Sequence, residues 1–359
     1  MGCWGSQVQI LPPRPSSPVA VKHTVAWLFH PASSTTPLPC DSPTGGFFRL
    51  QRLVGMEQEI TQAPDWFVRA VQTPYRERRI EVEGCPIHYL TWGETGKPGL
   101  LLVHGGGAHA HWWDFIAPFF IDRYSVCAVD LSGMGDSGHR DQYSGDLFAK
   151  ELMSVCEDAG FGANTVIAGH SFGGLATLKA GLHYANRLSG IVVCDSAIFP
   201  PGFSPGNDMR SSPFKEKKTV YPDFESAVAR FKLVPPQPCA NRYILDYIAR
   251  HSLMAVEGGW TWKFDMRFLQ KTIYDDLAME VKQLKIPAAM LYGEKSMLFG
   301  KFMLENTRKW YADDVPFICL PKARHHLFLD EPLDFVDTLA GIIDPWTGVP
   351  AATPAKRLP

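Results

Sequence analysis

The stretch from Thr165 to Ala180 constrains the fold of this chain more than any other. It joins a short apolar run, 165–168, to a turn with glycines on both sides of a serine, and then to helix-forming residues. This order predicts a strand, a sharp turn and a helix, which together lift a serine out of a sheet on a strained turn. The helix start directs backbone N–H groups and the positive end of its dipole toward Ser171. The alternative is a glycine-rich turn in which Ser171 has no chemical role.

Apolar runs of strand length alternate with helix-like segments on both sides of this stretch. The predicted strands are residues 80–83, 87–92, 100–103, 124–130, 165–168, 190–195, 286–292 and 315–320. Helices are expected at about 145–160 and 331–343. This alternation predicts an α/β fold with a mostly parallel central sheet flanked by helices. Ligands of such sheets bind beyond the carboxyl ends of the strands.

The segment 198–283 interrupts the alternation with a proline-rich entry and several helix-like pieces. We expect it to form an inserted helical lid over the carboxyl edge of the sheet. Residues 1–55 carry many prolines and few charges, so we expect a disordered N-terminal extension, with Met56 as a candidate start. The predicted organisation is an extension (1–55), a first core part (56–197), the lid (198–283), a second core part (284–345) and a loose tail (346–359).

Composition excludes several classes of protein. The 359 residues include 35 basic and 37 acidic side chains, so the net charge of −2 gives no reason to expect nucleic acid as a partner. No apolar run reaches about 18 residues, so no membrane span is expected. The eight cysteines form no C-x-x-C pair and several lie in strand-like runs. Buried free thiols in a reducing cytoplasm explain them better than disulfides or zinc.

Four motifs occur in an order typical of one superfamily. They are His104-Gly-Gly-Gly107, Asp130 with Gly133-Met-Gly-Asp-Ser137, the turn Gly169-His-Ser-Phe-Gly173, and the late segment 321–332 that contains Arg324-His-His326. Over about residues 78–343 the chain resembles the α/β-hydrolase superfamily, in its serine-nucleophile, lid-bearing branch. The resemblance implies that Ser171 is a nucleophile and that a histidine accepts its proton. His325 fits the spacing of that histidine, and His326 beside it remains an alternative.

The carboxylate that orients this histidine is less clear from the motifs. The family usually places it in a G-x-x-D pattern after a late strand, and here that run reads Gly293-Glu-Lys-Ser296. Two carboxylates could replace the missing one. Asp195 ends the predicted strand 190–195, and Glu294 lies two residues before the usual position. We favour Asp195, because a strand end holds a side chain more firmly than a loop does.

The resemblance also implies an oxyanion hole built from the backbone N–H groups of Gly106 and Phe172. Aromatic side chains near the site and in the lid suggest an apolar substrate. The candidate substrate-binding residues are His104, Gly105, Trp112, Trp113, His170 and Trp262. Arg250 and Lys263 could instead bring a cation to a substrate carboxylate, or could pair with acidic residues of the lid.

These features predict a hydrolase without cofactor or metal that cleaves a small or medium, largely apolar ester or related acyl compound through an acyl-enzyme on Ser171. Its partner would be a small molecule, and the protein a cytoplasmic monomer or homodimer. Haloalkane dehalogenases and epoxide hydrolases of this fold carry a carboxylate nucleophile where this chain has serine. The alternatives are a carbon–carbon bond hydrolase of the ring-cleavage type and a low-turnover ligand receptor.

Overall fold

A computed structural model describes residues 63–199, 201, 219–274 and 276–350, all within the compact unit Pro31–Pro359. The predictions for residues 1–55, for the start at Met56 and for most of the tail lie outside the described residues. No helix in the described ranges is both long and apolar enough to cross a membrane.

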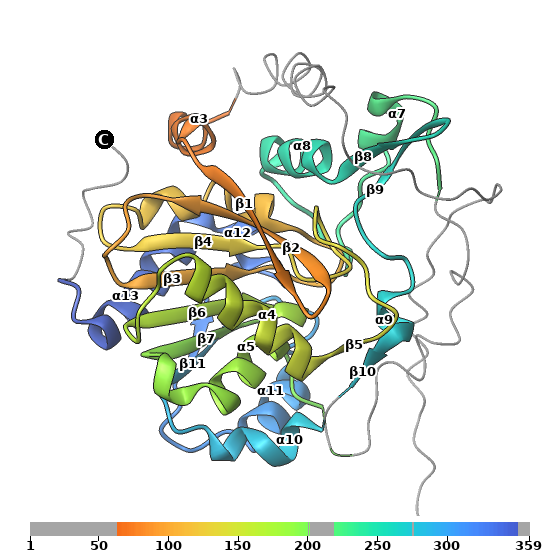
Figure 1. Cartoon of the computed structure of the whole chain (residues 1–359). Helices are drawn as coiled ribbons and strands as arrows, with labels where there is room; N and C mark the ends of the chain where they lie inside the picture. Colours follow the sequence, from red (N-terminus) through yellow and green to blue (C-terminus); the bar gives the residue numbers. More distant parts are fainter. Residues whose placement is uncertain (1–62, 200, 202–218, 275, 351–359) are drawn as a thin grey trace, which may run out of the picture. The chain divides into compact units, whose positions relative to one another are not determined.

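An eight-stranded sheet forms the centre of the fold, with the strand order β1-β2-β4-β3-β6-β7-β11-β12 (Figure 1). The first two strands pair antiparallel, β2 also pairs antiparallel with β4, and every later pair is parallel. The predicted α/β fold with a mostly parallel sheet is therefore confirmed. The strands are β1 (Arg76–Val82), β2 (Cys85–Trp92), β3 (Gly99–Val103), β4 (Ser125–Val129), β6 (Thr165–His170), β7 (Gly190–Cys194), β11 (Ala288–Gly293) and β12 (Phe317–Leu320).

Both faces of the sheet are covered, so its central strands are buried along their whole length. Alternate side chains point to opposite faces. In β3, Leu100 and Leu102 join a core cluster with helix α13 (Pro332–Thr347), whereas Leu101 and Val103 join a second cluster with α4 (Gly145–Asp158). Helix α5 (Phe172–His183) packs beside α4 on that second face (Figure 1). This two-sided burial explains why the strands read as continuous apolar runs.

Local signals explain where the flanking helices begin and end. Ser144 caps α4 by accepting the backbone N–H of Leu147. Helix α13 starts with Pro332 in its first turn and ends at Gly348, whose φ of 69° is left-handed. This helix runs four residues past the predicted end at 343. It includes Pro345, which has no N–H to donate to the carbonyl of Gly341 four residues earlier.

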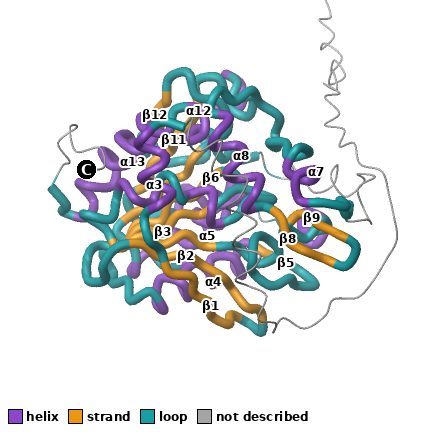
Figure 2. Tube along the Cα trace, turned by 90° about the horizontal axis from the view of Figure 1, so that it is seen from above, coloured by secondary structure: helices purple, strands orange, loops and turns teal. Residues whose placement is uncertain are grey.

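The segment 198–283 contains strands as well as helices, which differs from the purely helical lid that we predicted. Helices α7 (Phe224–Val228) and α8 (Arg242–His251) accompany the antiparallel pair β8 (Leu253–Val256) and β9 (Gly259–Trp262), as Figure 2 shows. Two-residue strand β10 (Thr272–Ile273) pairs with β5 (Tyr143–Ser144). The shorter helices are α9 (Phe268–Lys271), α10 (Leu277–Glu280) and η4 (Val281–Gln283).

The remaining elements surround the sheet. They are α3 (Asp65–Gln72), η1 (Ala110–Trp113), η2 (Ala117–Phe119), η3 (Ala185–Arg187), α11 (Lys301–Arg308) and α12 (Leu327–Asp330). Four of the described cysteines are buried thiols, as expected, but Cys319 is exposed. It lies in β12, the last strand of the sheet, which has no neighbour on its outer side. An edge strand shields its side chains less than a central one.

Candidate active site

Ser171 occupies the turn between β6 and α5 in a strained conformation. Its φ of 52° and ψ of −118° lie in a region that non-glycine residues rarely adopt. The backbone is held there on both sides: the Ser171 N–H donates to the Cys194 carbonyl at 2.8 Å, and its carbonyl accepts from Gly174 at 2.9 Å. Because the surrounding bonds impose this geometry, the hydroxyl is presented at the carboxyl end of β6.

The glycines on either side of Ser171 allow backbones to approach each other. A Cβ on Gly169 would lie 2.4 Å from the Gly173 carbonyl oxygen, and one on Gly173 would lie 2.3 Å from the carbonyl oxygen of His104. Both distances are far inside van der Waals contact, so neither position accepts a side chain without a shift of backbone. These glycines therefore bring the loop after β3 directly against the turn that carries Ser171.

His325 and Asp195 form a buried pair. Nδ1 of His325 lies 2.8 Å from Oδ1 of Asp195, and the two residues are 1% and 0% exposed. Because a carboxylate only accepts, this contact assigns the proton to Nδ1 and leaves Nε2 with a lone pair. Nε2 is buried and has no hydrogen-bond partner in the described part of the chain. This imidazole is therefore arranged to take up a proton, with a negative charge behind it.

Asp195 follows β7 with a φ of 48°, a left-handed conformation that aspartate tolerates. Its other oxygen, Oδ2, accepts the backbone N–H of Gly293 at 2.8 Å, and Oδ1 also accepts the Ser296 hydroxyl at 2.6 Å. Three donors thus hold this carboxylate in place. Glu294, the alternative acid, is exposed, and it accepts the N–H of Lys322 at 2.8 Å. The structure brings Asp195, not Glu294, to the histidine.

The contacts of His325 and His326 also differ: only His325 contacts a carboxylate among the described residues. The backbone N–H of His326 donates to the Gln237 side chain at 3.0 Å, and its ring lies 5.5 Å from the Trp112 ring, centroid to centroid. No carboxylate contact to His326 occurs among the described residues. Burial, and then the neighbouring His325 ring, lower the pKa of His326 well below its ordinary value. It is therefore a neutral packing partner of the site.

His170 connects the serine turn to this pair. Its Nε2 donates to the backbone carbonyl of His325 at 2.8 Å, and the two rings lie 4.7 Å apart. The His170 ring also lies close to Gly105. A Cβ on Gly105 would lie 3.0 Å from Nδ1 of His170 and 3.2 Å from Cβ of Ser171. Burial lowers the pKa of His170 well below its ordinary value, so the ring is neutral. His170 thus positions the backbone of His325 beside the serine turn.

The two predicted oxyanion donors lie near each other. A Cβ on Gly106 would lie 3.6 Å from Cβ of Phe172. Phe172 is the first residue of α5, so its N–H has no acceptor inside the helix. The dipole of α5 adds positive potential at the same point. Both backbones are therefore adjacent to Ser171, where an anionic oxygen would form.

Two predicted substrate-binding residues have other partners. His104 donates from Nδ1 to the Gly105 carbonyl at 2.7 Å and accepts at Nε2 from Leu131 at 3.1 Å, so both ring nitrogens are engaged. Trp113 is fully buried and stacks on Phe335 in the core cluster. These contacts give His104 and the Trp113 ring packing or hydrogen-bonding partners within the protein.

Trp112 and Trp262 share a neighbour, Phe231, whose ring lies 6.3 Å from that of Trp112 and 6.0 Å from that of Trp262. Trp112 contacts His326, whereas Trp262 lies in β9, where its ring is 5.9 Å from that of Tyr221. The two cations considered for a substrate carboxylate are paired inside the protein. Arg250 binds Glu225 and Asp246 at 2.8 and 2.7 Å, and Lys263 binds Asp136 at 2.5 Å.

Sequence reasoning missed Ser296 as a partner of Asp195. The available signal was that Ser296 occupies the usual position of the family's acid. A hydroxyl at that position can donate to a carboxylate on a neighbouring strand. It also missed the buried cluster of His111, Asp114 and His251, for which the H-x-x-D spacing was the signal.

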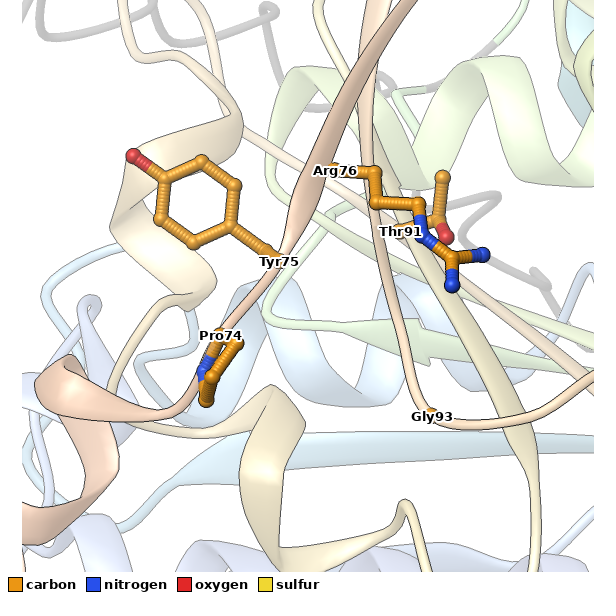
Figure 3. Close-up of a pocket in the computed structure, with 5 residues that line it drawn as sticks. All are labelled: Pro74, Tyr75, Arg76, Thr91 and Gly93. Carbon is orange, nitrogen blue, oxygen red and sulfur yellow. The ribbon is translucent and has the colours of Figure 1, made fainter.

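A cavity of about 120 Å³ lies elsewhere, lined by Pro74, Tyr75, Arg76, Thr91 and Gly93 (Figure 3). None of the predicted site residues lines this cavity.

Comparisons with known proteins agree with this architecture. The sequence profile of the alpha/beta hydrolase family matches residues 100–338, and the chain therefore belongs to that family. Human Epoxide hydrolase 4 is 23% identical over 73% of this chain and 76% of its own length. The Pimeloyl-[acyl-carrier protein] methyl ester esterase of Aeromonas hydrophila is 26% identical over 67% of this chain and 94% of its own.

A solved structure shares the fold. E-2-(Acetamidomethylene)succinate Hydrolase superposes with a TM-score of 0.66 at 20% identity, covering 76% of this chain and all of that one. Together these relatives support a hydrolase of the alpha/beta family.

Proposed function

We propose that this protein is a serine hydrolase that cleaves a small or medium-sized, largely apolar ester or related acyl compound. The observation that carries the proposal is the buried pair of Asp195 and His325. Nε2 of His325 has no hydrogen-bond partner among the described residues, and His170, which precedes Ser171, donates to the His325 carbonyl. A nucleophilic serine needs a nearby base, and the base needs a third group that orients it. We infer that Ser171, His325 and Asp195 fill these three roles.

In the proposed reaction, Oγ of Ser171 attacks the acyl carbon while Nε2 of His325 takes the hydroxyl proton. The N–H groups of Gly106 and Phe172 stabilise the negative oxygen. When the tetrahedral intermediate collapses, the leaving oxygen takes the proton from Nε2 and departs as an alcohol. Water then attacks the acyl-enzyme, gives its proton to Nε2, and the acid is released as the proton returns to Ser171.

The pairing of the nearby cations supports an apolar substrate. Arg250 and Lys263 are both neutralised by carboxylates, so neither is available to a substrate carboxylate at low cost. Aromatic rings pack around the histidines, with Phe328 5.1 Å from His170 and Trp112 5.5 Å from His326. We further propose that residues 198–283 act as a lid. Tyr247 of α8 donates to Asp114 at 2.5 Å, which supports contact between this segment and the loop after β3.

The relatives named as epoxide hydrolases suggest a different reaction. Opening an epoxide in this superfamily uses a carboxylate nucleophile, and a serine ether would not be released by water as an ester is. Ser171 therefore favours acyl transfer, in line with the relative named as a methyl ester esterase.

A fluorophosphonate probe, which reacts with activated serines, tests the proposal. We expect the wild type to be labelled and the Ser171→Ala variant to be silent. Ser226→Ala, which removes an exposed serine, is the matched control and should label like the wild type. A wild type that does not react would favour a ligand receptor. A panel of p-nitrophenyl esters should then show faster turnover of apolar acyl groups than of acyl groups that carry a carboxylate.

A further inference from the structure

Three histidine rings pack together at the proposed site. The ring centroids of His170, His325 and His326 lie 4.7, 4.8 and 5.4 Å apart, and the residues are between 1% and 3% exposed. One ring nitrogen of each lies within 4.8 Å of the others. The proposed hydrolysis uses one of these rings as a base and makes no use of the free nitrogens of the other two.

Each ring has a nitrogen without a hydrogen-bond partner in the described part of the chain. These atoms are Nδ1 of His170, Nε2 of His325 and one nitrogen of His326, and all are buried; the His326 ring also interacts with the backbone carbonyl of Pro235. A buried polar atom without a partner is costly, so such a group of them calls for an explanation. An unpartnered nitrogen on a single ring can be the catalytic base. Unpartnered nitrogens on three adjacent rings indicate a shared ligand.

The opposite nitrogens of two rings are engaged as in metal sites. A metal-bound histidine nearly always donates its other N–H to a carboxylate or a backbone carbonyl. Nδ1 of His325 contacts Asp195, and Nε2 of His170 contacts the His325 carbonyl, both at 2.8 Å. These contacts fix the orientation of the two rings. They leave the free nitrogen of each ring with a lone pair rather than a proton.

We propose that His170, His325 and His326 bind a divalent zinc ion, which inhibits the enzyme reversibly. Imidazole nitrogens suit zinc, and sites with three protein ligands leave a fourth position for a small molecule. No covalent bond changes: the ion accepts the Nε2 lone pair of His325, which can then no longer take the Ser171 proton.

Zinc binding by itself does not depend on the proposed function, whereas the inhibition does. Calorimetry with zinc chloride therefore comes first, on the full chain and on the Ser171→Ala variant. We expect both to bind one equivalent with similar affinity. The His326→Asn variant removes a ligand but keeps the Asp195–His325 pair, and its affinity should fall at least about tenfold. The matched control is His251→Asn, a buried histidine of the other histidine cluster, which should keep the wild-type affinity.

X-ray absorption at the zinc edge of the loaded wild type needs no variant and so covers the case in which His326→Asn does not fold. We expect about three imidazole nitrogens at about 2.0–2.1 Å. Sulfur ligands, absence of binding, or a loss of binding in His251→Asn but not in His326→Asn would each overturn the inference. Esterase assays with zinc, then with a chelator, complete the test. Zinc binding without any esterase activity would reject the proposed function and keep the site. Esterase activity without zinc binding would reject the zinc site and keep the proposed function.

Discussion

The hydroxyl of Ser296 donates a 2.6 Å hydrogen bond to Oδ1 of Asp195, the same oxygen that His325 contacts. Ser296 lies where the motif of this family usually has its acid, and its hydroxyl contacts a carboxylate that follows a neighbouring strand. Neighbouring strands β7 and β11 make this possible, because Asp195 follows one and Gly293 ends the other.

We expect Ser296→Ala to lower kcat by a factor of about 10–150 with little change in KM, because a hydrogen bond to a charged group contributes about 1.5–3 kcal/mol. Ser296→Thr keeps the hydroxyl and should restore kcat. Equal kcat values for the wild type and Ser296→Ala would contradict a role for this contact in the reaction.

Asp195→Asn should lower kcat by about 10⁴-fold, because the amide no longer holds the tautomer that leaves Nε2 free or stabilises the imidazolium. Glu294→Gln is the matched control and should change kcat less than about twofold, since the Glu294 carboxylate is exposed and accepts the backbone N–H of Lys322. Steady-state kinetics on a p-nitrophenyl ester measure both. Equal losses in the two variants would contradict the assignment of Asp195.

Gly169→Ala should lower the free energy of unfolding by about 1–3 kcal/mol, the usual range for forcing atoms into a packed core. The added Cβ would meet the Gly173 carbonyl oxygen at 2.4 Å, and a backbone atom cannot rotate away. Gly162→Ala, whose Cβ would meet nothing within 4 Å, should stay within about 0.5 kcal/mol of the wild type. Urea denaturation followed by circular dichroism compares them. Similar midpoints would argue against the tight turn.

The stability should depend on pH through His111. Burial lowers the pKa of this ring, but the charge and the 2.8 Å hydrogen bond of Asp114 outweigh burial, so the net pKa is raised. Lys263 opposes this shift, and Asp130 supports it. A group with a raised pKa in the folded state stabilises fully below its unfolded pKa of about 6.5, and this stabilisation disappears as pH rises through the folded pKa.

The stability difference between wild type and His111→Asn should therefore be largest near pH 5.5 and narrow toward about pH 9. Thermal melts across this range measure it. His183→Asn, which removes an exposed histidine, is the control and should show a nearly constant difference, since its contact with Asp146 is solvated. A stability difference between the wild type and His111→Asn that widens with rising pH would contradict this prediction.

Some elements of the fold could not be read from the sequence. The β8–β9 pair consists of four-residue strands in the segment predicted to be helical, and such short strands show too little alternation to be recognised. Helix α3 has eight residues, with Phe67 and Ala70 buried against the core. Its stability comes from that packing rather than from an intrinsic helical tendency, which explains why composition alone did not reveal it.

The sequence by itself determined the sheet, the serine turn and the chemical types at the site. Those features depend on local order: apolar runs of strand length, and glycines where a side chain would clash with backbone. Tertiary structure alone decided which carboxylate meets His325, because Asp195 is 130 residues away and Glu294 only 31. Strand pairing in the sheet sets that distance. Separation along the chain carries no information about it, since crossover connections return distant residues to the same edge.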